Sequence, residues 1–184
     1  MKILCFDLEI RDSVSSHPLG WEGARNGGCG ISALVVYDSD TRRFHIYDEH
    51  TLEEAMDHLN TADLLVSYNG LEFDCEVLRG VLGRYVTVPQ YDILHEIWGS
   101  LGGRKKGYKL EQVAEATLEM HKGGSGEFAT TLVKQKRWGE LFDYCLQDVH
   151  LCRELLNHIT DCGWIKGADG QQVTMPKPLI GELA

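Results

Sequence analysis

The segment "CFDLEI", residues 5–10, places two carboxylates, Asp7 and Glu9, in an otherwise apolar stretch. Side chains of a β-strand alternate between its two faces, so one face here is entirely apolar and the other turns from apolar to acidic. Asp7 and Glu9 share the second face with Cα atoms about 7 Å apart. That separation suits two carboxylates converging on a pair of metal ions roughly 4 Å apart. A strand that ends at the surface with both acids solvated is the alternative.

The remaining sequence predicts that this strand, at 2–10, belongs to a mixed α/β fold. Apolar runs bounded by turn residues predict strands at 30–38, 42–48 and 63–68, the first two joined as a hairpin. Helical periodicity and capping signals predict helices at 51–62, 72–82, 91–99, 109–118 and 138–160. The first of these begins with Thr51 as N-cap and Glu54 three residues later, the pattern of a capping box.

Two further segments complete the expected organisation of the 184 residues. Residues 11–28 are polar and rich in glycine, and we expect a loop there. Residues 164–173 predict a small hairpin around 167–170. The sequence contains no internal repeat and no low-complexity tract. We therefore expect one domain over 1–184, in which 163–184 form a C-terminal hairpin and tail.

Composition narrows the class of protein. A formal net charge of −10 argues against a non-specific nucleic-acid coat, but it is compatible with an acidic metal site in a nucleic-acid enzyme. The six cysteines form no CxxC pair, which predicts reduced thiols and neither a disulfide framework nor a zinc site. No apolar run is long enough to span a bilayer, and no signal-peptide pattern is present. We expect a cytoplasmic protein without membrane association.

A third carboxylate follows the predicted strand at 63–68. The segment "LLVSYNGLEFD", residues 64–74, runs from that strand through an Asn-Gly turn signal to Asp74 in the first turn of the next helix. An acidic residue in a first turn is favoured by the helix dipole, which is one explanation. The other is that Asp74 is delivered to the ends of the strands, where open α/β sheets place ligands.

The last long helix carries the next polar pair. In "WGELFDYCLQDVHLCRELLNHI", residues 138–159, an apolar stripe at helical spacing predicts an amphipathic helix. Tyr144 and Asp148 are four residues apart and stand one turn apart on the flank of this stripe. Ordinary polar flanks of a packed helix are the alternative explanation.

The three segments together resemble the sequence motifs of the DEDD superfamily of 3′→5′ exonucleases, which have a ribonuclease H-like fold. The matching residues are "FDLE" (6–9), "YNGLEFD" (68–74) and "YCLQD" (144–148). The tyrosine four residues before the last aspartate is similar to the tyrosine branch, which includes the proofreading domains of family B DNA polymerases. The other branch has a histidine five residues before that aspartate, and this chain has Asp143 there. The resemblance implies an α/β fold with a mixed central sheet flanked by helices.

The resemblance also implies roles for the five motif residues. Asp7 would bridge two divalent cations, Glu9 and Asp148 would bind the ion that activates water, and Asp74 would act on the second ion. The Tyr144 hydroxyl would orient the attacking water. All-oxygen ligands favour Mg²⁺ or Mn²⁺.

The expected substrate is a single-stranded nucleic acid, DNA or RNA, held at its 3′ end. Basic residues around an aromatic in 102–109 suit backbone and base contacts. The candidate substrate-binding residues are Asn69, Arg104, Lys105, Lys106, Tyr108 and Lys109. Solvated flanking loops are the alternative explanation for this basic stretch, and a helicase or polymerase partner stays an open question.

Two other functions are compatible with the same patterns. An endonuclease or resolvase could share the fold, although the Tyr-x-x-x-Asp motif on the last helix resembles the exonucleases. A non-catalytic nucleic-acid-binding domain would suit the acidic net charge, but it would keep four carboxylates together at a cost without using them.

Overall fold

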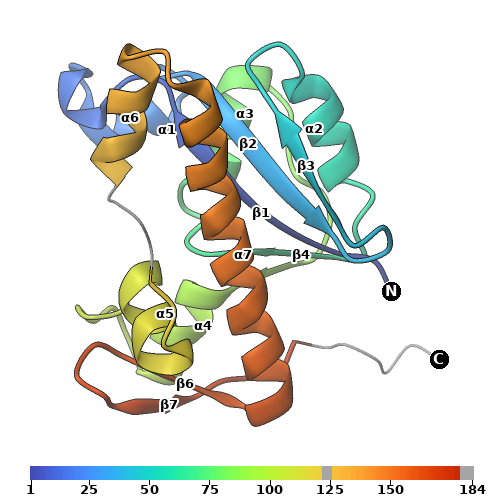
Figure 1. The fold of residues 1–184 in the computed structure, drawn as a ribbon, viewed down its shortest axis with the longest axis vertical. Coiled ribbons are helices and arrows are strands. Elements are labelled where there is room, and N and C mark those ends of the chain that lie inside the picture. Colours follow the sequence, from blue (N-terminus) through green and yellow to red (C-terminus); the bar gives the residue numbers. More distant parts are fainter. Residues whose placement is uncertain (122–125, 179–184) are drawn as a thin grey trace.

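A five-stranded mixed sheet forms the centre of the computed structural model, which describes residues 1–121 and 126–178 (Figure 1). The strand order is β3-β2-β1-β4-β5, with β1 antiparallel to β2, β2 antiparallel to β3, and β1, β4 and β5 mutually parallel. The strands are β1 (Ile3–Ile10), β2 (Ile31–Asp38), β3 (Arg43–Tyr47), β4 (Leu64–Ser67) and β5 (Gln90–Asp92). The predicted α/β class with a mixed central sheet is confirmed.

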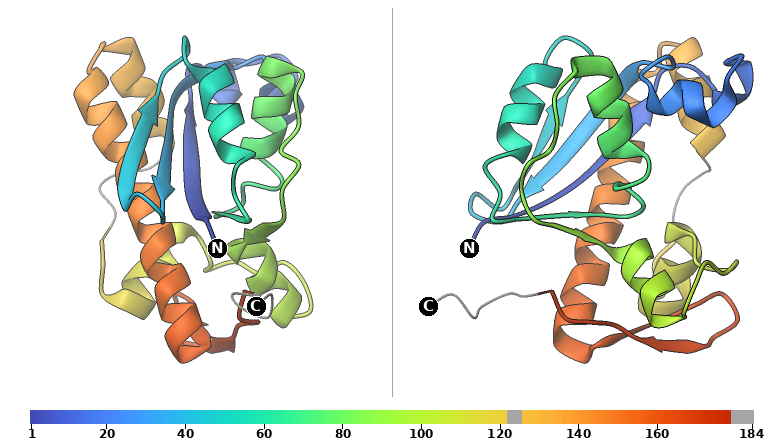
Figure 2. Two further views of the ribbon diagram at one scale, coloured as in Figure 1. Left: turned by 90° about the vertical axis from the view of Figure 1, so that its right-hand side faces the viewer. Right: turned by 180° about the vertical axis from the view of Figure 1, so that it is seen from behind.

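Helices cover both faces of this sheet (Figure 2). They are α1 (Gly20–Arg25), α2 (Leu52–Leu59), α3 (Asp74–Leu82), α4 (Ile93–Ser100), α5 (Leu110–Leu118), α6 (Gly126–Lys134) and α7 (Trp138–Cys162). Helices α1, α2 and α3 share one apolar core with the sheet, and α4, α5, α6 and α7 share the core on the other face. The predicted C-terminal hairpin is present as β6 (Trp164–Lys166) and β7 (Gln172–Thr174), which pair antiparallel beside α5 and the end of α7.

The side chains of β1 alternate as the sequence predicts. Leu4, Phe6, Leu8 and Ile10 are buried in the core with α1, α2 and α3. Cys5 is buried in the opposite core, which contains α7. Because strand side chains repeat every two residues, Asp7 and Glu9 lie on the α7 face of the sheet.

Strands β1 and β4 stay paired only over the first part of β1. Their register runs from Ile3 opposite Leu64 to Cys5 opposite Val66, and β4 ends at Ser67. Strand β1 continues to Ile10 while remaining paired with β2. This divergence frees one edge of β1 beyond Cys5, in the part of the strand that carries the two acids.

The segment 11–28 is not the simple loop that its composition suggests. It contains a short 3₁₀ helix, η1 (Val14–Ser16), and α1, which packs against α3. The two helices approach closely at glycines: a Cβ added at Gly27, where φ is +81°, would lie 2.6 Å from the carbonyl carbon of Gly80. A helix this short is stabilised by its tertiary contact, and the local sequence has no periodicity that predicts it.

Other local expectations need correction as well. Thr51 precedes α2, but its hydroxyl oxygen accepts the Asp48 amide hydrogen at 2.9 Å and caps no helix amide, so the predicted capping box does not form. The helix expected from 91 begins at Ile93, because residues 90–92 pair with β4. Helix α6 was not predicted.

Within residues 1–121 and 126–178, no helix combines the length and apolar character needed to cross a bilayer. The organisation of 1–184 as one domain stays a prediction, and part of its expected tail, residues 179–184, lies outside the described residues.

Candidate active site

Three carboxylates from two distant parts of the chain converge at the C-terminal end of β1. One oxygen each from Asp7, Glu9 and Asp148 lies within 4.8 Å of the other two. Helix α7 brings Asp148 to this position because it packs across the face of the sheet that carries the acids (Figure 1). Glu9 and Asp148 are buried and Asp7 is half-buried. Oxygen ligands of one Mg²⁺ ion at about 2.1 Å lie roughly 3–4 Å apart, so oxygens within 4.8 Å of one another can bind one hard divalent cation after moving closer by at most about 2 Å.

Asp74 adds a fourth carboxylate from the opposite side of the sheet. It is the first residue of α3, and its Oδ1 accepts the backbone amide hydrogen of Leu8 at 3.1 Å. The carboxylate thus occupies the edge of β1 that β4 has left. Burial raises the pKa of Asp74 to about 7, and the negative charges of Asp92 and Asp148 act in the same direction. A cation bound nearby would favour the ionised form of Asp74 by compensating its negative charge.

Asp92, which the sequence analysis did not single out, holds the turn that delivers Asp74. The residue is 1% exposed, and its carboxylate accepts the backbone amide hydrogens of Asn69 and Leu71 at 2.8 and 3.0 Å. The same carboxylate caps α4 by accepting the amides of Leu94 and His95. An acidic residue just before a helical apolar run is the signal of an N-cap, and it could have identified this position.

Tyr144 lies one turn before Asp148 on α7, and both side chains are buried. The ring of Phe128, from α6, meets the Tyr144 ring edge to face with centroids 5.9 Å apart. Helix α6 therefore covers Tyr144 with an aromatic side chain that is itself partly exposed. The unpredicted helix contributes directly to the surroundings of the site.

Cys145 is a second residue that sequence reasoning missed at this site. Its thiol donates to the Asp7 backbone oxygen at 3.4 Å and lies 3.7 Å from Asp7 Oδ2. Burial raises its pKa well above the usual range, and the nearby charges of Asp7, Glu9, Asp148 and Asp74 raise it further. The thiol consequently stays neutral and acts as a donor toward the acidic cluster.

The predicted basic stretch lies between α4 and α5, and it contacts the segment that leads to Asp74. Arg104 forms an ion pair with Glu72, and its guanidinium lies 4.7 Å from the centre of the Trp98 ring. Lys105, Lys106 and Lys109 are exposed. Asn69 is half-buried in the turn, with a left-handed φ of +68°. Arg104 is thereby held beside the site, with its side chain still 66% exposed.

The expectation that Tyr108 contacts substrate does not fit its position. The residue is 4% exposed, because the turn of the β6–β7 hairpin packs over it. A Cβ added at Gly167 would lie 2.7 Å from the Tyr108 ring, and the Ala168 amide donates to the Gly107 carbonyl at 2.9 Å. The Tyr108 carbonyl accepts a hydrogen bond from the Tyr68 hydroxyl at 2.6 Å. Tyr108 is a packing residue that anchors the basic stretch.

Comparisons with known proteins bear on the fold of the chain. The sequence profile of the RNase_H superfamily matches residues 20–160. A search of curated protein sequences found no match. Among solved structures, the family B DNA polymerase from the hyperthermophilic archaeon Pyrobaculum calidifontis superposes with a TM-score of 0.67 at 19% sequence identity. That match covers 86% of this chain and 24% of the polymerase chain.

The ribonuclease H-like fold is confirmed, and this fold resembles part of a family B DNA polymerase. The assignment to the tyrosine branch stays a prediction, as do the individual roles of the site residues. The chain spans about a quarter of the polymerase length, so what the polymerase does as a whole says nothing direct about this chain.

Proposed function

The chain belongs to the ribonuclease H superfamily, and from that premise we propose that it is a metal-dependent 3′→5′ exonuclease acting on single-stranded nucleic acid, DNA or RNA. The observation that carries the proposal is the convergence of Asp7, Glu9 and Asp148, whose oxygens lie within 4.8 Å of one another. Asp74 completes the set from the other side of β1. The direction of hydrolysis is proposed from the resemblance of the three motifs to the exonucleases.

The donor set supports binding of two Mg²⁺ or Mn²⁺ ions. All four side chains offer oxygen, which these ions prefer, and four buried or half-buried acids need positive charge to remain ionised together. We propose that Asp7 bridges the two positions, that Glu9 and Asp148 complete one of them, and that Asp74 serves the other. Bound ions would activate a water molecule and stabilise the departing 3′-oxygen.

The chain itself orients the water and the substrate. Tyr144 stands one turn from Asp148, and we propose that its hydroxyl hydrogen-bonds the attacking water and fixes its direction of approach. Asp92 keeps Asp74 in place by holding the 69–71 turn. Arg104, Lys105, Lys106 and Lys109 supply positive charge for the phosphates of a strand that leads to the carboxylates.

The test compares a linear and a circular single strand of the same sequence with Mg²⁺ or Mn²⁺. A 5′-labelled linear strand is expected to shorten as a ladder, a 3′-labelled strand to release labelled mononucleotide at once, and the circle to persist. The variant Asp148→Asn should abolish the reaction. Asp143→Asn, an exposed acid on the same helix, is the matched control and should retain it.

Two results would overturn the proposal. Rapid cutting of the circle would favour the endonuclease interpretation, because no strand end is then needed. Absence of any product with either metal and either nucleic acid would favour a binding domain without catalysis.

A further inference from the structure

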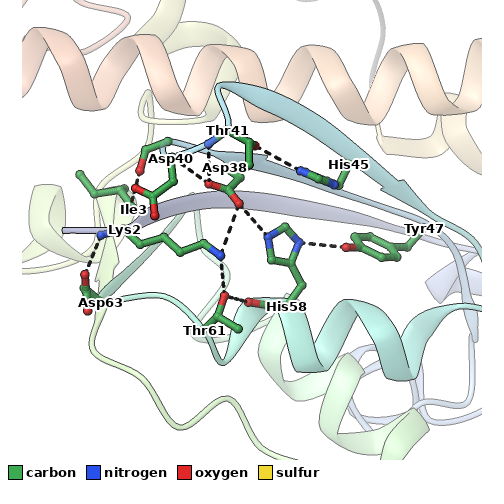
Figure 3. A network of polar contacts seen from close by, with 11 residues as sticks. Lys2, Ile3, Asp38, Asp40, Thr41, His45, Tyr47, His58, Thr61 and Asp63 are labelled. Atoms are coloured by element: carbon green, nitrogen blue, oxygen red, sulfur yellow. Dashed lines mark hydrogen bonds and ion pairs between the residues drawn. The ribbon is translucent and has the colours of Figure 1, made fainter.

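A second cluster of potential metal ligands lies on the opposite face of the sheet. Asp38 at the end of β2, His45 on β3 and His58 on α2 each offer one ligand atom, and these atoms lie within 4.8 Å of one another (Figure 3). Asp38 of β2 lies directly opposite Leu4 of β1, so the two side chains lie on the same face of the sheet. Leu4 is buried against α2, and this face is therefore the one that α2 covers. Asp7 and Glu9 lie further along β1 on the α7 face. The cluster is therefore separate from the catalytic carboxylates.

The ligand atoms of this cluster are oriented by their neighbours. His58 Nε2 lies 3.2 Å from Asp38 Oδ2, while His58 Nδ1 is hydrogen-bonded to the Tyr47 hydroxyl at 2.9 Å. Asp38 Oδ1 accepts the amide hydrogens of Asp40 and Thr41, which leaves Oδ2 facing the histidine. Metal-binding histidines are commonly fixed in this way, with the second ring nitrogen held by a polar partner.

The Asp38 carboxylate already forms an ion pair with the ammonium group of Lys2. Lys2 Nζ lies 3.4 Å from Asp38 Oδ2 and 2.8 Å from Thr61 Oγ1. The Lys2 side chain is 23% exposed, so its ammonium can move into solvent when another cation arrives. The His45 ring lies edge to face with the His58 ring, with centroids 4.8 Å apart, and its Nε2 lies 3.5 Å from Thr41 Oγ1.

We propose that Asp38, His45 and His58 bind one transition-metal ion of the Zn²⁺ class, with Lys2 as the cation that it displaces. Imidazole nitrogens favour Zn²⁺, Ni²⁺ and Cu²⁺, whereas the all-oxygen catalytic cluster favours Mg²⁺ and Mn²⁺. Ligands about 2.1 Å from a tetrahedral ion lie about 3.4 Å apart, so the widest pair has to close by at most about 1.4 Å. His45 lies half-buried on the edge strand β3 and can make this movement.

The hydrogen bond between His58 Nδ1 and the Tyr47 hydroxyl leaves Nε2 as the ring nitrogen that faces Asp38. Neutral imidazole is the form that binds metal. The ion would join the β2–β3 hairpin to α2, so its role is structural.

The experiment titrates metal-free protein with Zn²⁺ by calorimetry, and with Co²⁺ followed by its visible absorption, while millimolar Mg²⁺ occupies the catalytic cluster. One equivalent is expected to bind with the Co²⁺ spectrum of a nitrogen-ligated site. His45→Asn and His58→Gln should each weaken binding by at least about tenfold, and Tyr47→Phe by about 10–100-fold through loss of orientation. His50→Asn, an exposed histidine at the end of the same hairpin, should bind as the wild type does.

One further variant is expected to bind Zn²⁺ more tightly, so its result does not depend on whether the other variants fold. Lys2→Met removes the competing ammonium and should tighten Zn²⁺ binding, whereas weaker or unchanged binding would overturn the placement of the ion. Binding of Zn²⁺ that persists in both His45→Asn and His58→Gln, or no binding by the wild type, would overturn the site itself. Mg²⁺-dependent hydrolysis should be unchanged in His45→Asn, which separates this result from the test of the proposed nuclease activity.

Discussion

Replacing Asp74 with asparagine is expected to stabilise the metal-free protein at neutral pH although it removes a carboxylate from the candidate site. Burial, followed by the charges of Asp92 and Asp148, raises the pKa of Asp74 from an ordinary 3.8 to about 7. Asparagine keeps an oxygen that can accept the Leu8 amide hydrogen and removes the ionisable group. The substitution therefore changes charge with little change in shape.

The raised pKa fixes the sign and size of the effect. Between about pH 4 and pH 7 the folded protein holds a proton on Asp74 that the unfolded chain releases, so the free energy of unfolding falls as pH rises through this window. A shift of about three units at 1.36 kcal/mol each amounts to about 4 kcal/mol. Asp74→Asn has no ionisable group at this position, so its free energy of unfolding does not fall for this reason as pH rises. Its advantage over the wild type should be near zero at about pH 4 and should grow to about 4 kcal/mol by about pH 8.

The assay is guanidinium unfolding in EDTA across this pH range, followed by tryptophan fluorescence. Asp143→Asn, at an exposed position of α7, is the control and should shift the free energy of unfolding by no more than about 0.5 kcal/mol at any pH. Adding Mn²⁺ should stabilise the wild type more than Asp74→Asn, because binding to the folded state depends on the carboxylate. The reasoning would be refuted if metal-free Asp74→Asn were less stable than the wild type at pH 8. It would also be refuted if the difference in free energy of unfolding between the two proteins did not change with pH.

Further substitutions test the other parts of the site. Tyr144→Phe should lower turnover about 100-fold with little change in KM, measured on a 5′-labelled strand; full turnover would remove the hydroxyl from the mechanism. Asp92→Ala should lower the free energy of unfolding by about 3 kcal/mol, since it leaves several part-buried amides without their acceptor, and Asp92→Asn should recover part of this loss. Joint replacement of Arg104, Lys105 and Lys106 by alanine should weaken binding to all sequences alike and reduce the salt slope by about 0.7 for each lost phosphate contact; an unchanged slope would place the strand elsewhere.

The acidic cluster could be predicted because its local geometry follows from short-range periodicity. A two-residue repeat puts Asp7 and Glu9 on one face of a strand, and a four-residue spacing aligns Tyr144 with Asp148 on a helix. The sequence periodicities do not bring these elements together. That step came from the resemblance of three motifs, and the structure agrees with it by bringing Asp7, Glu9 and Asp148 together.

What the sequence did not predict depends on contacts between distant residues. Helix α1 exists where Gly27 meets Gly80, and β5 is a three-residue strand that exists by pairing with β4. Tyr108 stands among basic residues and suggested an exposed ring, but the hairpin turn at Gly167 covers it. Asp92 was included in an expected helix, and its hydrogen bonds to the 69–71 turn become visible only in the folded chain.

The hydrogen bond from the Leu8 amide to Asp74 has a spectroscopic consequence. The Ile3 amide of β1 bonds to the Ser39 hydroxyl oxygen, and amides paired with β2 or β4 bond to carbonyl oxygens, none of which titrates, whereas the Leu8 amide bonds to a titrating carboxylate. Its nitrogen and proton resonances should therefore move as Asp74 ionises or binds a cation. Its exchange with deuterated solvent should slow when metal holds Asp74 in place and accelerate when the side chain is truncated to alanine. A single backbone position in the central strand thus records the state of the candidate site without any substrate being present.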